Sequence, residues 1–267
     1  MFRGFNITLS SELSDYVKIG RKLARSEKNR IADTLASFID NKGDVIAEKL
    51  IDEWFPKENY DIFISHSHKD INLALSLAGY LEEKLGLSCF IDYQAWNYCD
   101  DLLKSVDNLY CYQKTSKTYN YSKRNRTTAH IHNMLCIALA EMMDKSECLF
   151  FINTKNSIEN QHISASYSEG SSTYSPWLYY EISMLNIINI KKPNRGGDIV
   201  ESMLRKDSMA TEAYDSIPIK YRINIENLPQ LDNADIIKWC AEKRRTDLVR
   251  SEEKIHSLDI LYRMYPR

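Results

Sequence analysis

Long hydrophobic runs are missing from this sequence, and glycine and proline are scarce. Apolar runs such as ECLFFIN (147–153) and MLNIINI (184–190) are far shorter than the roughly 20 residues that span a bilayer. The stretch MFRGFNITLSSELSDYV (1–17) lacks the unbroken apolar core of a secretory signal. The 8 Gly and 6 Pro among 267 residues argue against low-complexity linkers. The sequence therefore predicts a cytoplasmic protein without a membrane partner.

An excess of charge of either sign is also absent. The formal net charge is −2, so bulk electrostatics gives no reason to expect a nucleic-acid partner. The six cysteines are scattered without a C-x-x-C pair, which suits reduced thiols better than a disulfide framework or a zinc site. A hydrophobic share of 43% is typical of a globular chain. The length allows one sizeable core plus an appendage, or two modest domains.

The chain divides into a helical start and a longer part in which strands alternate with helices. Apolar stripes at helical spacing run through residues 10–56 and end at Pro56, which predicts a helical appendage over 1–57. Short apolar runs predict buried strands at 60–65, 87–92, 147–153 and 219–225. Helices are predicted at 70–86, capped by Asp70 and stopped at Gly86, and at 127–146, 175–188, 233–245 and 248–265.

Alternating strands and helices predict an open, mostly parallel sheet with helices on both faces. In such sheets, ligands bind beyond the carboxyl ends of the strands. The polar segments that follow the first three predicted strands are SHSHKD (65–70), DYQAWNYCDD (92–101) and NTKNS (153–157). We expect the start of helix 175–188 at the same edge, with Glu181 at the rim of a binding site.

The segment SPWLYYEISML (175–185) holds an acid beside an apolar helix face. Ser175 and Pro176 are typical of a helix start. Trp177 and Glu181 lie one turn apart, next to an apolar stripe made by Leu178, Ile182 and Leu185. On these residues alone, Glu181 is either a solvated helix residue or a functional acid, and the first is the commoner case.

Several sequence motifs of enzymes and metal sites are absent. No G-x-G-x-x-G follows a strand, and neither a P-loop nor a G-x-S-x-G elbow occurs, so the corresponding nucleotide sites and hydrolases are not predicted. Histidines 66, 68, 130 and 132 suggest a metal, but residues two apart on a helix point to nearly opposite sides, and we expect no metal site.

The tract 93–126 has two interpretations. It is rich in tyrosine and ends in the basic run SKRNR (122–126). Such residues form either a solvated connection packed down by its aromatics, or groups that neutralise phosphates and stack on a nucleobase.

Three segments together resemble a TIR (Toll/interleukin-1 receptor) domain. YDIFISHSHKD (60–70) resembles the first box of the family, with His66 where tyrosine is often found. CFIDYQAW (89–96) resembles the second strand and the start of the BB loop, and SPWLYYEI (175–182) resembles the Ser-Pro-Trp-x-x-x-Glu helix of the enzymatic members. The resemblance implies a flavodoxin-like, TIR-like α/β domain over 58–245, with 246–267 as a C-terminal helix packed on it.

Two features depart from the family pattern. WNYCDD (96–101) stands where the BB loop often has a Pro-Gly pair, which weakens the case for self-association through that loop. The tract 104–126 is longer than a typical TIR connection, and we expect it to shape a particular pocket.

The resemblance implies two alternative functions. Some TIR domains are adaptors that act by association, whereas others cleave NAD at the nicotinamide–ribose bond and require the helix glutamate. Glu181 falls at that position, where a fixed carboxylate can stabilise an oxocarbenium-like ribose. As further pocket residues we expect Ser65, His66, Asp92, Trp96 and Trp177.

We therefore expect an enzyme that takes NAD as its substrate and needs no bound cofactor. It resembles the stand-alone bacterial TIR proteins of antiphage systems such as Thoeris, in which a cyclic or conjugated ADP-ribose-derived product signals to a separate effector protein. Self-association is a further expected interaction. The alternatives are a non-catalytic TIR adaptor and, more distantly, a nucleoside-processing transferase on a similar sheet.

Overall fold

The protein is described from a computed structural model. It covers residues 1–28, 46–47, 49, 51, 59–158, 171–193, 195, 221–249 and 254–266 of the chain, with the backbone alone at 11–12, 25–28 and 93–98. Within these ranges, none of the helices combines the length and the apolar character that crossing a bilayer requires.

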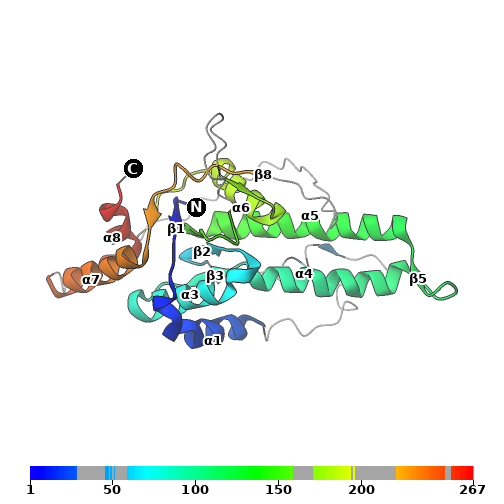
Figure 1. Ribbon diagram of the computed structural model, residues 1–267, viewed down its shortest axis with the longest axis horizontal. Helices are drawn as coiled ribbons and strands as arrows, with labels where there is room; N and C mark the ends of the chain where they lie inside the picture. Colours follow the sequence, from blue (N-terminus) through cyan, green and yellow to red (C-terminus); the bar gives the residue numbers. More distant parts are fainter. Residues whose placement is uncertain are drawn as a thin grey trace.

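A five-stranded sheet forms the centre of the molecule (Figure 1). In spatial order its strands are β3 (Cys89–Ile91), β2 (Ile62–Ser65), β6 (Cys148–Ile152), β1 (Arg3–Ile7) and β9 (Gln230–Leu231). All four pairings are parallel, so the predicted parallel sheet is confirmed. If β2, β3 and β6 are numbered 1, 2 and 3 in chain order, their spatial order is 2-1-3, as in flavodoxin-like sheets.

Helices cover both faces of this sheet. On one face, α4 (Tyr93–Val106), α5 (Tyr121–Lys145) and α6 (Pro176–Ile187) pack against Phe63, Leu149 and Phe151. The other face carries α3 (Ile71–Leu85), α7 (Asn233–Val249) and α8 (Ser257–Met264), over Ile62 and Phe150. Neighbouring strand residues point to opposite faces, so these apolar runs are buried on both sides, as parallel strands require.

The start of the chain differs from the expected helical appendage. Arg3–Ile7 forms β1, between β6 and β9, and its Phe5 and Ile7 side chains are fully buried. A short helix η1 (Ser11–Tyr16) and α1 (Val17–Lys28) follow, and α1 packs on α3. A Cβ atom at Gly20 would lie 1.9 Å from the Leu75 carbonyl oxygen, so this close approach requires glycine. These first residues belong to the α/β body, and most of 29–58 lies outside the described residues.

The predicted helix after β2 is confirmed with Asp70 at its N-cap, but the Asp70 side chain makes no capping hydrogen bond. Gly86 ends α3 in the left-handed conformation, with φ 63°, as predicted. Asp70 ends the short helix η3 (His68–Asp70) and stands at the N-cap of α3 without a side-chain cap. Its carboxylate instead accepts hydrogen bonds from Thr154 Oγ1 (2.5 Å) and Asn156 Nδ2 (2.7 Å), which tie the loop after β6 to the start of α3.

The C-terminal part also differs from the sequence prediction in detail. Of the strand expected at 219–225, residues 221–225 are described, and only Tyr221–Arg222 form a strand, β8. It pairs antiparallel with β7 (Ser172–Thr173) outside the central sheet. The fifth place in the sheet belongs to β9, which was not predicted. α7 continues to Val249, beyond the expected boundary at 245, and α8 packs its Leu258 and Leu261 into the core.

The tract expected to shape a pocket forms the end of an arm. α4 continues into a π-helix, η4 (Asp107–Cys111), a hairpin of β4 (Tyr112–Gln113) and β5 (Thr118–Tyr119) follows, and α5 returns to the sheet. α4 and α5 lie side by side and carry the hairpin well beyond the sheet (Figure 1).

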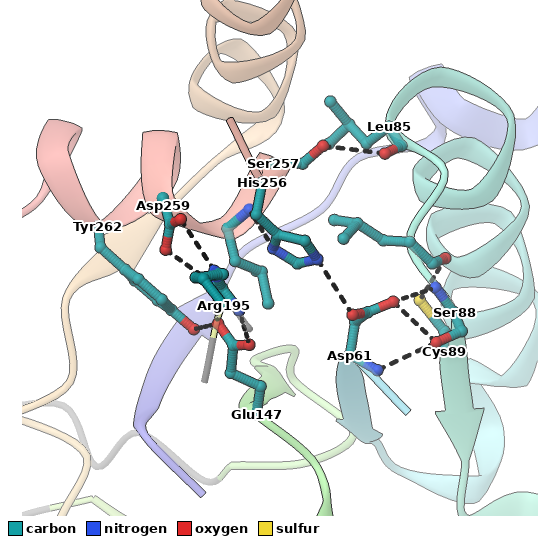
Figure 2. Close-up of polar contacts among 12 residues, drawn as sticks. Asp61, Leu85, Ser88, Cys89, Glu147, Arg195, His256, Ser257, Asp259 and Tyr262 are labelled. Atoms are coloured by element: carbon teal, nitrogen blue, oxygen red, sulfur yellow. Dashed lines mark hydrogen bonds and ion pairs between the residues drawn. The ribbon is translucent and has the colours of Figure 1, made fainter. Parts of the chain in front are cut away.

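A polar network fastens α8 at the amino ends of the strands (Figure 2). Asp61, just before β2, accepts hydrogen bonds from the backbone and side chain of Ser88 and lies 3.4 Å from His256 Nε2. Arg195 binds both Glu147, before β6, and Asp259 of α8. These charges are mutually paired, which indicates a structural role for this edge.

Candidate functional site

Two strand ends bring the first polar side chains of the candidate site together. Ser65 is the last residue of β2, and His66 follows it. Asp92 follows β3 and precedes α4. Ile64 and Ile91 are paired in the sheet, so Ser65 and Asp92 lie level at the carboxyl edge, where the sequence predicted a site.

The helix that bears Glu181 begins as its sequence predicts. Ser175 Oγ accepts a hydrogen bond from the Leu178 backbone N–H at 3.3 Å, and Pro176 occupies the first turn. Leu178 and Ile182 are buried, as expected, and Glu181 lies between them. The expectation that Glu181 lies at a rim is wrong, because its exposed fraction is 0%. α6 packs on the sheet, so the face of the helix that carries Glu181 is buried.

Two direct contacts organise the site. Ser65 Oγ donates a hydrogen bond of 2.5 Å to Glu181 Oε2. His66 Nδ1 lies 2.7 Å from Asp92 Oδ1, at ion-pair distance but without the alignment of a hydrogen bond. All four residues are buried. The structure thus gathers Ser65, His66, Asp92 and Glu181, which the sequence placed in one pocket, into one cluster.

The protonation of Glu181 follows from this enclosure. Burial raises the pKa of Glu181 well above its usual value, and the neighbouring Asp92 raises it further by its charge and by a hydrogen bond. The hydrogen bond from Ser65 acts in the opposite direction but does not outweigh them. Two adjacent buried carboxyl groups cannot both ionise freely. Glu181 therefore keeps its proton to a higher pH than an exposed glutamate does.

Glu181 Oε1 and both ring nitrogens of His66 are buried and make no aligned hydrogen bond among the described residues. The Asp92 carboxyl is the neighbour of both side chains. A buried polar atom left unpaired costs about 1–3 kcal/mol, so native proteins keep few of them. Their presence in one cluster at the carboxyl edge indicates groups held for a ligand rather than for stability.

Helix α5 supplies a neighbouring wall that the sequence did not reveal. The ring of Trp177 meets that of His132 edge to face, with centroids 5.3 Å apart. Tyr180 donates a hydrogen bond of 2.5 Å to the Cys136 carbonyl oxygen. Burial raises the pKa of the Cys136 thiol to about 11, and the Glu181 charge contributes. The four-residue spacing of His132 and Cys136 was the available signal, since it puts both on one face of the helix.

Of the two remaining expected site residues, Trp177 packs on His132 of α5. Trp96 lies in α4, but its side chain lies outside the described residues. Of the histidines that the sequence suggested as metal ligands, His68 and His130 are exposed, whereas His66 is buried. Among the described residues, no group of three or more His, Cys, Asp or Glu side chains is arranged to hold a metal ion.

The arrangement suits chemistry that develops positive charge. A carboxyl fixed by Ser65, a second carboxyl at Asp92 and an imidazole at His66 can stabilise a cationic centre or move a proton. Neither a family model, nor a curated protein, nor a solved structure matches this chain.

Proposed function

We propose that this chain is a TIR-type enzyme that cleaves NAD at the nicotinamide–ribose bond, with Glu181 as its catalytic residue. The observation that carries the proposal is the enclosed carboxyl of Glu181, which accepts a hydrogen bond from Ser65 and is flanked by Asp92. The Ser-Pro-Trp-x-x-x-Glu segment around it is the sequence feature that points to NAD.

The chemistry of the bond explains the residue types. Loss of nicotinamide leaves oxocarbenium-like charge on the ribose, which a fixed carboxylate stabilises. Nicotinamide leaves as a neutral molecule, so a strong general acid is not required. The substrate itself carries a pyridinium charge, and an approaching cation favours the ionised form of Glu181. Binding of NAD thus supplies the interaction that overcomes the raised pKa.

The enclosure of Glu181 adds a requirement. Because its exposed fraction is 0%, NAD reaches the carboxyl only after the packing between α6 and the strand ends loosens. We therefore propose that the described arrangement is a resting state, and that self-association or another trigger opens it. A rise of specific activity with protein concentration is the expected sign of self-association, through mass action.

The test is release of nicotinamide from NAD by the purified full chain, measured by chromatography over a wide range of protein concentrations. Glu181→Gln should abolish release, because it removes the charge and keeps the shape. Glu83→Gln, an exposed acid of α3, is the matched control and should behave as the wild type. Equal release by the wild type and Glu181→Gln would overturn the catalytic assignment.

The second candidate function is a non-catalytic TIR adaptor that acts by association. The same burial of Glu181 favours it, because a fully enclosed acid can serve packing and orientation alone. The two functions differ in one outcome. An adaptor releases no nicotinamide at any concentration, whereas the enzyme does so once it is assembled.

We further propose that the product is an ADP-ribose-derived signal, cyclic or conjugated, which activates a separate effector protein. Such a product requires that the site close again over bound NAD, since a site that excludes water favours a bound or internal nucleophile over hydrolysis. Mass spectrometry of the NAD reaction tests this directly. Linear ADP-ribose as the sole product would leave a plain NAD hydrolase.

A further inference from the structure

The end of the arm is an exposed structure held by polar contacts, and the proposed reaction does not use it. At its base, the buried Asp107 binds Arg124 Nε at 2.8 Å and Thr127 Oγ1 at 2.9 Å. Asn120 caps α5 by accepting a hydrogen bond from the Lys123 backbone N–H at 3.0 Å. These contacts fix the hairpin on the two helices, so the side chains it carries have defined positions.

Positive charge is concentrated at this end of the arm. From Asn108 to Ala140 the sequence contains no Asp or Glu. The nearest acid, Asp107, is buried and already paired with Arg124. The same span has five Lys and Arg residues, all exposed: Lys114, Lys117, Lys123, Arg124 and Arg126. A chain with a net charge of −2 thus segregates a cationic surface from an otherwise acidic body.

Tyrosine rings are interleaved with these cations. Tyr112 and Tyr119 face each other across the hairpin with ring centroids 5.4 Å apart, and Arg124 lies 5.4 Å from the Tyr119 ring centre. Tyr110 and Tyr121 flank this pair, and the exposed fraction of Tyr121 is 68%. Exposed aromatic rings that are grouped in one patch indicate an interaction surface.

We propose that the arm tip, meaning residues 108–126, binds single-stranded nucleic acid. Lysine and arginine would contact the phosphates, and the flanking tyrosines would stack on unpaired bases. Lysine is depleted in protein–protein interfaces, which disfavours an acidic protein partner. Insertion into a membrane favours Trp, Phe and Leu. The exposed large apolar side chains of the tip are tyrosines and a single leucine, Leu109, which disfavours a membrane as the partner.

The tip and the Glu181 cluster are separate sites. Tyr121 is the first residue of α5, and Cys136 of the same helix lies beside Glu181. At a rise of 1.5 Å per residue, Tyr121 and Cys136 are about 22 Å apart along the helix. Glu181→Gln should therefore leave nucleic-acid binding unchanged. The proposal for the tip also stands or fails independently of NAD cleavage.

The experiment is fluorescence anisotropy of labelled oligo(dT) and oligo(U), each of about 20 nucleotides, with the full chain between roughly 20 and 200 mM salt. Arg124 is paired with Asp107, so the other four cations of the tip are available for phosphates. At about −0.7 per contact on a single strand, the expected slope of log affinity against log salt concentration is about −3. Lys114→Gln/Lys123→Gln should reduce the slope by about 1.4. Tyr121→Ala should weaken binding about tenfold, the loss of one stacked base.

The matched control is Lys238→Gln/Arg244→Gln, which removes two exposed cations of α7 and should leave binding unchanged. Polyglutamate of equal length and anionic phosphatidylserine vesicles are the competing probes. Binding of either probe in preference to the oligonucleotides would overturn the proposal. So would the absence of oligonucleotide binding at the lowest salt, or equal weakening by the tip variants and the α7 control.

Discussion

Ser65 Oγ donates a 2.5 Å hydrogen bond to Oε2 of Glu181, and this contact joins the end of β2 to α6 across 116 positions of the sequence. Burial and Asp92 raise the pKa of Glu181, while the Ser65 hydrogen bond lowers it. Ser65 and Asp92 therefore act on the same carboxyl in opposite directions. This opposition yields two predictions of opposite sign.

Ser65→Ala should raise the pKa of Glu181 further, because the ionised form loses its donor. For each unit that the pKa rises, the pH at which a given rate of nicotinamide release is reached should move up by about one unit. The rate should recover at higher pH. Ser65→Thr keeps the hydroxyl and is the control. An equal loss at every pH would point to a structural effect alone.

Asp92→Asn should shift the pH profile of nicotinamide release in the other direction. Removal of the neighbouring charge lowers the pKa of Glu181, so the ionised form appears at lower pH. Asp101→Asn, an exposed acid of α4, should leave the profile in place. A shift of the Asp92→Asn profile to higher pH would contradict the effect of Asp92 on the Glu181 carboxyl.

Glu181→Gln should stabilise the protein as the pH rises. A carboxyl whose pKa is raised by folding favours the folded state below its unfolded pKa of about 4.3, and this contribution is lost as the pH rises through the folded value. Glutamine does not titrate, so the Tm of the variant relative to that of the wild type should rise with pH. Near pH 8 the difference should reach about 3 °C, which corresponds to about 1 kcal/mol in the free energy of unfolding. Thermal melts from about pH 4 to pH 8 measure it.

The control for that series is Glu83→Gln, at an exposed position of α3, whose difference from the wild type should show no such rise. A Tm for Glu181→Gln that falls below the wild type at high pH would mean that the ionised acid stabilises the fold.

Asp259→Asn should weaken the network that holds α8 (Figure 2). The hydrogen bond from Arg195 holds the pKa of Asp259 below its usual value. Its contribution is present above an unfolded pKa of about 3.9 and is lost as the pH falls through the folded value. The pair is partly exposed, so we expect a cost of about 0.5–1 kcal/mol near pH 7 and a smaller cost near pH 2.

Urea unfolding at the two pH values measures this cost. Asp247→Asn removes an isolated surface pair with Lys243 and should cost about 0.3–0.5 kcal/mol at most. Equal costs for Asp259→Asn at both pH values would show that packing, not charge, is what the substitution removes.

Local patterns predicted much of the fold. The short apolar runs of β2, β3 and β6, the cap at Ser175 and the stop at Gly86 are local signals, and they are confirmed. The rule that ligands bind at the carboxyl edge of a parallel sheet was enough to predict that Ser65, Asp92 and Glu181 lie together.

The parts that sequence patterns missed depend on distant partners. RGFNI is a strand because its residues pair with Cys148–Ile152 of β6, and nothing within the five residues reveals that partner. The burial of Glu181 likewise depends on how closely α6 approaches β2 and on Cys136 of α5. The hairpin that 108–126 forms at the end of a helical arm arises from contacts such as Asp107 with Arg124, which sequence spacing alone does not specify.

The most direct test of the account is nicotinamide release from NAD by the wild type and by Glu181→Gln, at matched and increasing protein concentrations. The account predicts release by the wild type that rises in specific rate with concentration, and none by the variant, although the variant is the more stable of the two near pH 8. Release by Glu181→Gln at the wild-type rate, or no release by the wild type at any concentration, would contradict it.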